Sequence, residues 1–237
     1  MTAVSITALL LLWEGASLLA GYGQLLPGPL ETLRATASLL GNPSFLKVVG
    51  STLLRGVTGF AAAILAGVAL GITGGLHSNF HAFMRPWVVV LRSTPVVAFV
   101  LLAIIWFSSD AVPVLIAILM MFPIVYLNVV EGIRSVDEGL VEMARFHGVH
   151  GWRLIREVHL PSIRPFLESG VVSAVGIGWR AVVGGEVLSQ PLWGIGTVMR
   201  SAQTFLRVDI LLAWTLVTLV IGAMFDILLR SHGHHSQ

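Results

Sequence analysis

The chain is 237 residues long, and its composition excludes most classes of soluble protein. Apolar residues make up 56% of it, charged residues only 11%, and the mean hydropathy is +0.89. A soluble domain carries about 25% charged residues because its surface faces water. The formal net charge of +2 gives no indication of nucleic-acid binding. The composition therefore predicts an integral membrane protein and excludes an ordinary soluble enzyme or a disordered chain.

A spanning helix needs about 20 mostly apolar residues to cross about 30 Å of hydrocarbon. Six stretches meet this requirement, at about residues 3–19, 53–76, 87–107, 112–130, 165–183 and 210–229. The first resembles a signal peptide in its apolarity, but no Lys or Arg precedes it and Glu14 interrupts it. We predict an all-α integral membrane protein in which residues 1–237 form a single domain with about six transmembrane helices.

Basic residues in the loops indicate the orientation, since cytoplasmic loops are enriched in Lys and Arg. Residues 131–164 hold five arginines, whereas the turn at residues 108–111 holds no basic residue. The outer loops carry at most two basic residues each, which does not reverse the assignment. Residues 131–164 are therefore expected in the cytoplasm, and alternation then places both termini there.

Small residues recur every four positions in two of the expected spans. The second span has Gly59, Ala63, Gly67, Gly71 and Gly75, and the fifth has Gly170, Ala174 and Gly178. Such stripes let helix backbones approach closely inside a membrane. Two interpretations remain open from the sequence, namely packing among the helices of one chain and a specific interface between subunits.

Motifs for nucleotide hydrolysis and for metal binding are absent from the sequence. A phosphate-binding loop needs a lysine after glycine, but the sole lysine, Lys47, lies between Leu46 and Val48. The chain has no cysteine, and His147 and His150 have no carboxylate partners at ligand spacing. We therefore expect no metal, no cofactor and no enzymatic activity in this chain.

Residues 131–164 predict two short helices, at about residues 137–147 and 152–158. Asp137 and Glu138 stand at the start of the first helix, where the helix dipole favours acids. Gly148 can take the left-handed conformation that ends a helix, and Pro161 is expected to end the second one. Pro165 would then begin the fifth span.

Within this loop, Glu142, Ala144, Gly148, Leu160-Pro161 and Pro165 form a pattern that resembles the EAA loop of ATP-binding-cassette (ABC) importer permeases. Glycine follows the glutamate by six residues and Leu-Pro stands at the family's offset, although Met143 replaces its usual first alanine. The resemblance implies a coupling helix that docks into a cytoplasmic ATPase subunit. The residues implied in coupling are Glu142, Ala144, Arg145, Gly148, Leu160 and Pro161.

The resemblance extends to the permeases of the nitrate, sulfonate and taurine group. It is carried by residues 25–29, 91–95, 106–107, 122–124 and 131–134, by Glu186, and by the Gly-x-Gly at residues 194–196. One departure is Ser108-Ser109, where that group usually has glycine after Trp-Phe. This departure leaves the outer turn between the third and fourth spans, and with it the substrate entrance, unassigned.

The family implies the partners and the location. These are a second permease copy, two ATPase subunits that hold ATP and Mg, an extracytoplasmic substrate-binding protein, and the lipid of a bacterial inner membrane. The expected substrate is a small anionic or polar solute, with a vitamin precursor or other organic solute as an alternative. A stand-alone ion-coupled transporter is the other class considered, but the inverted repeats and intramembrane acids typical of it are missing.

An ionisable residue in a span usually faces a partner or a water-filled path. Arg180 is the main candidate, and it would favour an anionic substrate if it lines the path. Alternatively, it pairs with Glu186 or extends to the outer membrane interface. Six residues along a helix separate the two side chains by about 120°, so a pair requires a break at Gly184-Gly185.

Three further residues are candidates for the translocation path. Trp179 is adjacent to Arg180 in the fifth span. Arg92 precedes Pro95 in the third span, where a structural or gating role is favoured over substrate contact. Trp106 stands at the outer boundary of that span, where anchoring at the membrane interface is the common role of tryptophan.

Overall fold

A computed structural model describes residues 2–19 and 26–233 of the chain. Within those residues every regular element is a helix, as the composition predicts. In chain order they are α1 (Thr2–Leu19), α2 (Pro29–Leu40), α3 (Phe45–Leu76), α4 (Ser78–Ser93), α5 (Val96–Trp106), α6 (Ala111–Arg134), α7 (Glu138–Phe146), α8 (Trp152–Leu154), the π-helical turn η1 (Ile155–His159), α9 (Leu160–Ser189), α10 (Ile195–Thr204) and α11 (Val208–Gly233).

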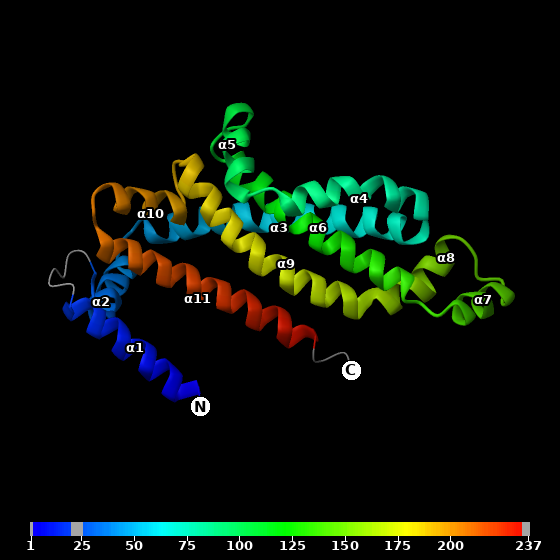
Figure 1. Ribbon diagram of the computed structural model, residues 1–237, viewed down its shortest axis with the longest axis horizontal. Helices are drawn as coiled ribbons and strands as arrows, with labels where there is room; N and C mark the ends of the chain where they lie inside the picture. The colour runs from blue at the N-terminus through cyan, green and yellow to red at the C-terminus, as the bar shows by residue number, and fades with distance from the viewer. Residues whose placement is uncertain (1, 20–25, 234–237) are drawn as a thin grey trace.

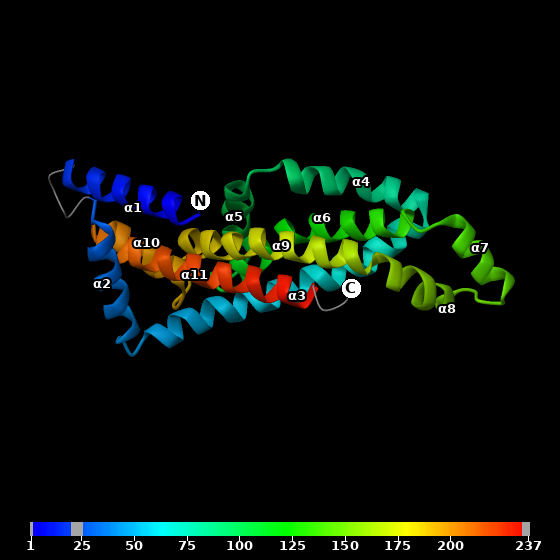
Figure 2. The ribbon, with the colours of Figure 1, turned by 90° about the horizontal axis from the view of Figure 1, so that it is seen from below.

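The centre of the molecule is a layer of three long helices, in which α6 lies between α3 and α9 (Figure 1). The largest buried cluster is built mainly from α3, α6, α9 and α11 and includes Ala117, Met121 and Val182. Helix α11 packs against α9 on one side, whereas α1 packs mainly against α2. The bundle is elongated, and α7 and α8 project beyond one end of it (Figures 1 and 2).

The glycine stripes pack within the chain. A Cβ at Gly67 would lie 2.7 Å from Val125, and one at Gly71 would lie 2.7 Å from Val129, both on α6. On α9, a Cβ at Gly170 would lie 2.8 Å from Asn128 of α6. The small residues therefore serve the close approach of α3 and α9 to α6, and these buried positions are not a surface for another subunit.

The third expected span, residues 87–107, is wrong as a single helix. Helices α4 and α5 meet at an angle of 100°, and α5 stands away from the bundle (Figure 1). The break falls at Thr94-Pro95, because proline lacks the backbone N–H and disfavours helical geometry in the preceding residue. Thr94 accordingly adopts an extended conformation with φ −80° and ψ 130°.

The fifth span is longer than expected and begins earlier. Neither Pro161 nor Pro165 bounds it, since Trp152–Ser189 forms one continuous helix of 38 residues. Its second turn, η1, is π-helical, and this wider turn makes room for the proline ring at Pro161. At about 1.5 Å per residue the helix is far longer than the hydrocarbon layer, so its first turns stand outside the membrane.

The expected count of six spans is not confirmed. In the described residues four helices are long and apolar enough to cross a membrane, or five if the bent pair of α4 and α5 counts as one span. Helices α3, α6 and α11 cover the second, fourth and sixth expected stretches. The long helix Trp152–Ser189, which includes α9, covers the fifth. The first stretch forms α1, which contains a shorter apolar helix, Val4–Leu19.

Close packing of α3 on α6 gives a direct test. Gly67→Ala should destabilise the protein by about 1–3 kcal/mol because the new methyl group overlaps Val125. Gly50→Ala is the matched control on the same helix, since no atom lies within 4 Å of its added methyl group. The control should be neutral or stabilising by up to about 1 kcal/mol. Thermal unfolding in detergent measures both, and a Gly67→Ala protein as stable as the control would contradict this packing.

Candidate functional site

Helix α7 is held by local signals that the sequence carries. The Asp137 carboxylate accepts a hydrogen bond from the Gly139 amide at 2.7 Å, which caps the start of the helix. Gly148 ends it with φ +77°, in the left-handed region that glycine favours, and its amide donates to the Arg145 carbonyl. Gly151 is also left-handed, with φ +57°, and returns the chain into α8.

The segment from α7 to η1, residues 138–159, forms an elbow at one end of the molecule (Figure 2). No residue of α7 is buried. Phe146 is 90% exposed, Trp152 71% and Met143 60%, although all three are large and apolar. An exposed apolar cluster on a projecting segment is typical of a surface that a partner covers.

The residues of the EAA-like pattern occupy two parts of the elbow. Ala144 lies within α7 and Gly148 directly after its end, while Glu142 and Arg145 border a cleft between α7 and the bundle. Leu160 and Pro161 are instead the first residues of α9, in the long continuous helix. The elbow is therefore joined to the membrane-spanning part without an intervening loop.

A buried ion pair lies towards the opposite end of the molecule. Nη1 of Arg55, on α3, donates to Oε1 of Glu186, on α9, at 2.6 Å. The Glu186 side chain is fully buried and that of Arg55 is 10% exposed. Arg55 also pairs with Asp110, just before α6, whose side chain is 69% exposed. One arginine thus joins three of the long helices.

Glu186 is satisfied by further donors on its second oxygen. The Thr52 hydroxyl donates to Oε2 at 3.0 Å, and the Gly196 amide donates to the same atom at 3.0 Å. The Ile195 amide donates to the Thr52 hydroxyl at 2.9 Å, so the start of α10 is tied to the same cluster. Glycine is required at Gly196 because a Cβ there would overlap the Val183 carbonyl and Glu186. This close approach explains the Gly-x-Gly that follows Glu186 in the sequence.

The proposed pair between Arg180 and Glu186 is wrong. Helix α9 continues through Gly184-Gly185, so the two side chains point in different directions, and Glu186 pairs with Arg55 instead. Arg180 is exposed, and its Nε donates to the Gly176 carbonyl at 3.0 Å. Arg55 was missed, although a basic residue inside an expected span was signal enough to single it out.

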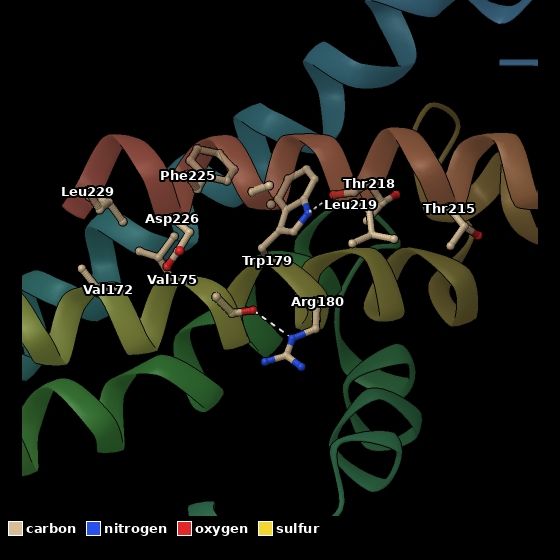
Figure 3. A pocket seen from close by; sticks show the side chains of 13 residues that line it. Val172, Val175, Trp179, Arg180, Thr215, Thr218, Leu219, Phe225, Asp226 and Leu229 are labelled. Atoms are coloured by element: carbon tan, nitrogen blue, oxygen red, sulfur yellow. Dashed lines mark hydrogen bonds between the residues drawn. The ribbon is translucent and has the colours of Figure 1, made fainter. Parts of the chain in front are cut away.

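Trp179 and Arg180 both border the cavity between α9 and α11, but their side chains point in different directions. Trp179 is buried and turns towards α11, where its Nε1 donates to the Thr218 carbonyl at 3.0 Å. The cavity is mainly apolar and has a volume of about 390 Å³. Figure 3 shows that the guanidinium of Arg180 points away from α11. Trp179 therefore packs between two helices, and Arg180 is directed outward.

The outward face of α9 differs from the other exposed helix faces. Along it the exposed residues Ser169, Ser173, Gly176, Arg180 and Gly184 recur at the helical repeat and are polar or small, although Ile177 and Leu188 are exposed there as well. Most exposed residues of α11, such as Leu219, Val220 and Ile227, are apolar, as lipid requires, and Asp226 is a charged exception. A polar face on a spanning helix avoids lipid and is suited to a water-filled path or another helix.

Arg92 and Trp106 lie near the two ends of α5. Arg92 lies in the last turn of α4, next to the break, and is exposed. Trp106 ends α5 and is 71% exposed. Neither lines the cavity that Trp179 and Arg180 border. The path candidates are thus not gathered into one pocket within a single chain.

Comparisons with known proteins identify the family. Residues 63–233 match the model of the binding-protein-dependent transport system inner membrane component. The chain belongs to this family. It is a multi-pass protein of the inner membrane and a component of an ABC transporter that works with ATPase and substrate-binding subunits.

Curated relatives cover most of the chain. The putative aliphatic sulfonates transport permease protein SsuC of Escherichia coli is 30% identical over 91% of this chain and 82% of its own length. The taurine transport system permease protein TauC of Escherichia coli is 26% identical over 92% and 82% respectively. The bicarbonate transport system permease protein CmpB of Synechococcus elongatus is 30% identical over 79% and 72%.

The buried pair predicts a strong effect on stability. Arg55→Met leaves the Glu186 carboxylate buried without its countercharge, which should cost about 3–5 kcal/mol of folding free energy. The double variant Arg55→Met with Glu186→Met removes both charges and should recover part of this loss. Thermal unfolding of the purified variants measures the difference. A single Arg55→Met variant as stable as the native protein would contradict the assigned role of the pair.

Proposed function

We propose that this chain is the translocating subunit of an ATP-driven importer and that the elbow couples it to an ATPase subunit. The observation that carries the proposal is the projecting elbow with its exposed apolar residues Met143, Phe146 and Trp152. Such a cluster forms the centre of an interface when a partner groove covers it. The ATPase subunits would hold ATP and Mg and would supply the energy that this chain lacks.

The membrane path is proposed to run along the polar face of α9. Two copies of the chain would bring two such faces together, which supports a homodimer with the path at its seam. Arg180 is the cation on this face, and its guanidinium points outward (Figure 3). Lined up with it, Ser169 and Ser173 offer hydroxyl groups to a passing solute.

An anionic solute, delivered by an extracytoplasmic binding protein, fits this face. Guanidinium groups bind sulfonate and carboxylate oxygens through paired, charge-assisted hydrogen bonds. The names of the relatives specify taurine, aliphatic sulfonates and bicarbonate, all of which carry a negatively charged oxygen group. A small sulfonate or carboxylate is therefore the substrate class that we propose for this chain.

The same assignment gives an orientation. If the elbow meets an ATPase it lies in the cytoplasm, and the Arg55–Glu186 pair then lies towards the outer side. The N-terminal end of α1 and the C-terminal end of α11 both point away from the end of the bundle where α2 and α10 lie (Figure 1). This arrangement supports cytoplasmic placement of both termini.

The elbow can be tested by a charge at its tip. Phe146→Asp should reduce the ATPase recovered with the purified permease by about tenfold or more, because it places a carboxylate in a desolvated contact. Phe146→Leu is the matched control and should retain the complex, since it keeps an apolar side chain. Stoichiometric ATPase bound to Phe146→Asp would refute docking at this tip.

The path can be tested at Arg180. Arg180→Gln should lower the uptake of a sulfonate substrate by roughly tenfold in proteoliposomes that contain the whole complex, because the charge-assisted contact is lost. Arg180→Lys keeps the charge and should retain most of the uptake. The stability of the complex should be similar in both variants, since Arg180 is exposed and no acidic residue pairs with it in the described part of the chain. Full uptake by Arg180→Gln would exclude it from the path.

A further inference from the structure

The cavity between α9 and α11 is large enough to hold an organic molecule. Its volume is about 390 Å³, and both of its walls belong to membrane-spanning helices. In another protein, an apolar cavity of about 150 Å³ is sufficient to bind benzene. The hydroxyls of Thr215 and Thr218, which line the cavity, already donate to carbonyls one turn earlier in α11. The cavity therefore offers a ligand mainly apolar surface.

Two aromatic side chains form part of the cavity wall. Trp179 of α9 and Phe225 of α11 both line it, with ring centroids 5.4 Å apart and ring planes at 65° (Figure 3). The indole N–H of Trp179 already donates to the Thr218 carbonyl, which fixes the orientation of this ring. Aromatic groups attract one another in edge-to-face contacts beyond the gain from buried area. The wall is therefore suited to an apolar ring.

Gly176 connects this cavity to the polar face of α9. It lines the cavity and is exposed, and no atom lies within 4 Å of a Cβ placed there. Its carbonyl accepts the hydrogen bond from Nε of Arg180, so the guanidinium is held beside the same opening. A molecule that binds the guanidinium can therefore extend across the bare backbone at Gly176 into the cavity.

Opposite charges at the two ends of the cavity favour one direction for an anion. Arg180 and Asp226 both line the cavity. Figure 3 shows Asp226 beside Val175, which is more than one helical turn along α9 from Arg180. An anionic group is attracted at the Arg180 end and repelled at the Asp226 end. The apolar part of the molecule would then lie between them, against the two aromatic rings.

We propose that this cavity is the subsite for the apolar body of the substrate, and that the substrate is an arylalkyl sulfonate or carboxylate. The anionic group would bind Arg180, and the ring would pack against Trp179 and Phe225. This inference rests on the proposed path along α9 and narrows its substrate class to anions that carry an apolar ring. A small anion without such a ring would leave the cavity unfilled.

Three matched compounds test the two parts of the subsite on the purified permease in lipid nanodiscs. Phenylethanesulfonate carries the ring and the anionic group, ethanesulfonate lacks the ring, and phenylethanol lacks the anionic group. Titration calorimetry measures their binding. Phenylethanesulfonate should bind at least about tenfold more tightly than either of the others, because the ring buries apolar surface and the sulfonate pairs with the guanidinium. Equal binding of ethanesulfonate or of phenylethanol would overturn the proposal.

Two variants locate the ring. Gly176→Leu places a side chain in the open space at the entrance, and Ala223→Leu narrows the cavity from α11. Each should weaken the binding of phenylethanesulfonate relative to ethanesulfonate by about tenfold. Gly50→Leu is the matched control, since Gly50 is an exposed helical glycine with equal space that does not line the cavity. A ring preference that persists in both cavity variants would place the ring in the lipid and contradict the proposal.

Arg180→Gln separates this inference from the proposed path in the same assay. It should weaken the binding of both sulfonates by about tenfold, because both use the guanidinium. If both sulfonates depend on Arg180 but bind equally well to the native protein, the cavity subsite is wrong and the proposed path stands. If the variant weakens neither sulfonate, the anion does not use Arg180, and the proposed path is wrong together with this inference.

Discussion

The arrangement of the long helices depends on one buried contact, the ion pair between Arg55 and Glu186. Glu186 is fully buried and Arg55 is only 10% exposed, so an unpaired charge in that position is strongly unfavourable. The pair fixes α3 against α9, and the hydrogen bonds from Thr52 and Gly196 extend the constraint to α10. Asp110 adds the start of α6, through a carboxylate that remains in contact with solvent. These charges set the position of α3 along α6, and that position allows the glycines of α3 to pack against α6.

A single continuous helix connects this contact to the elbow. Trp152–Ser189 begins within the elbow and ends three residues beyond Glu186. In the coupling that we propose, a displacement of the elbow would be carried along this helix to the charged cluster, with η1 as the irregular turn between them. The polar face of α9 lies on the same helix, so the elbow, the proposed path and the buried pair would move together. This arrangement is the physical basis of the proposed coupling.

Much of this arrangement could be predicted from the sequence. The apolar stretches predicted helices α3, α6, α9 and α11, because the hydropathy of a segment depends only on its own residues. Gly148 and Asp137 gave the ends of α7, because capping depends only on neighbouring residues. The angle between α4 and α5 was missed, although Pro95 marked its place, because a proline breaks a helix without fixing the direction in which the chain continues. The π-helical turn before Pro161 also depends on packing at the base of α9.

The buried charges show where such reasoning ends. The sequence offers Arg180, the nearest arginine, as one possible partner of Glu186, whereas its partner Arg55 lies 131 residues away. Only the packed bundle brings those two together. Similarly, Trp179 and Arg180 are neighbours in the sequence, yet helical geometry directs one into the protein and the other outward (Figure 3). Pairings between distant segments are set by the tertiary structure, so they could not be predicted from this single sequence.

The central claim is that the elbow and α9 move as one body when an ATPase acts on the elbow. Because the chain contains no cysteine, cysteines introduced at Arg156 and Leu188, which are both exposed, would be its only sites for spin labels. Pulsed electron resonance on the assembled complex would compare distances with and without bound ATP. The account predicts an unchanged distance of about 48 Å within one helix and a changed distance between the Leu188 labels of the two copies. A change within the helix, with the two copies fixed relative to each other, would contradict it.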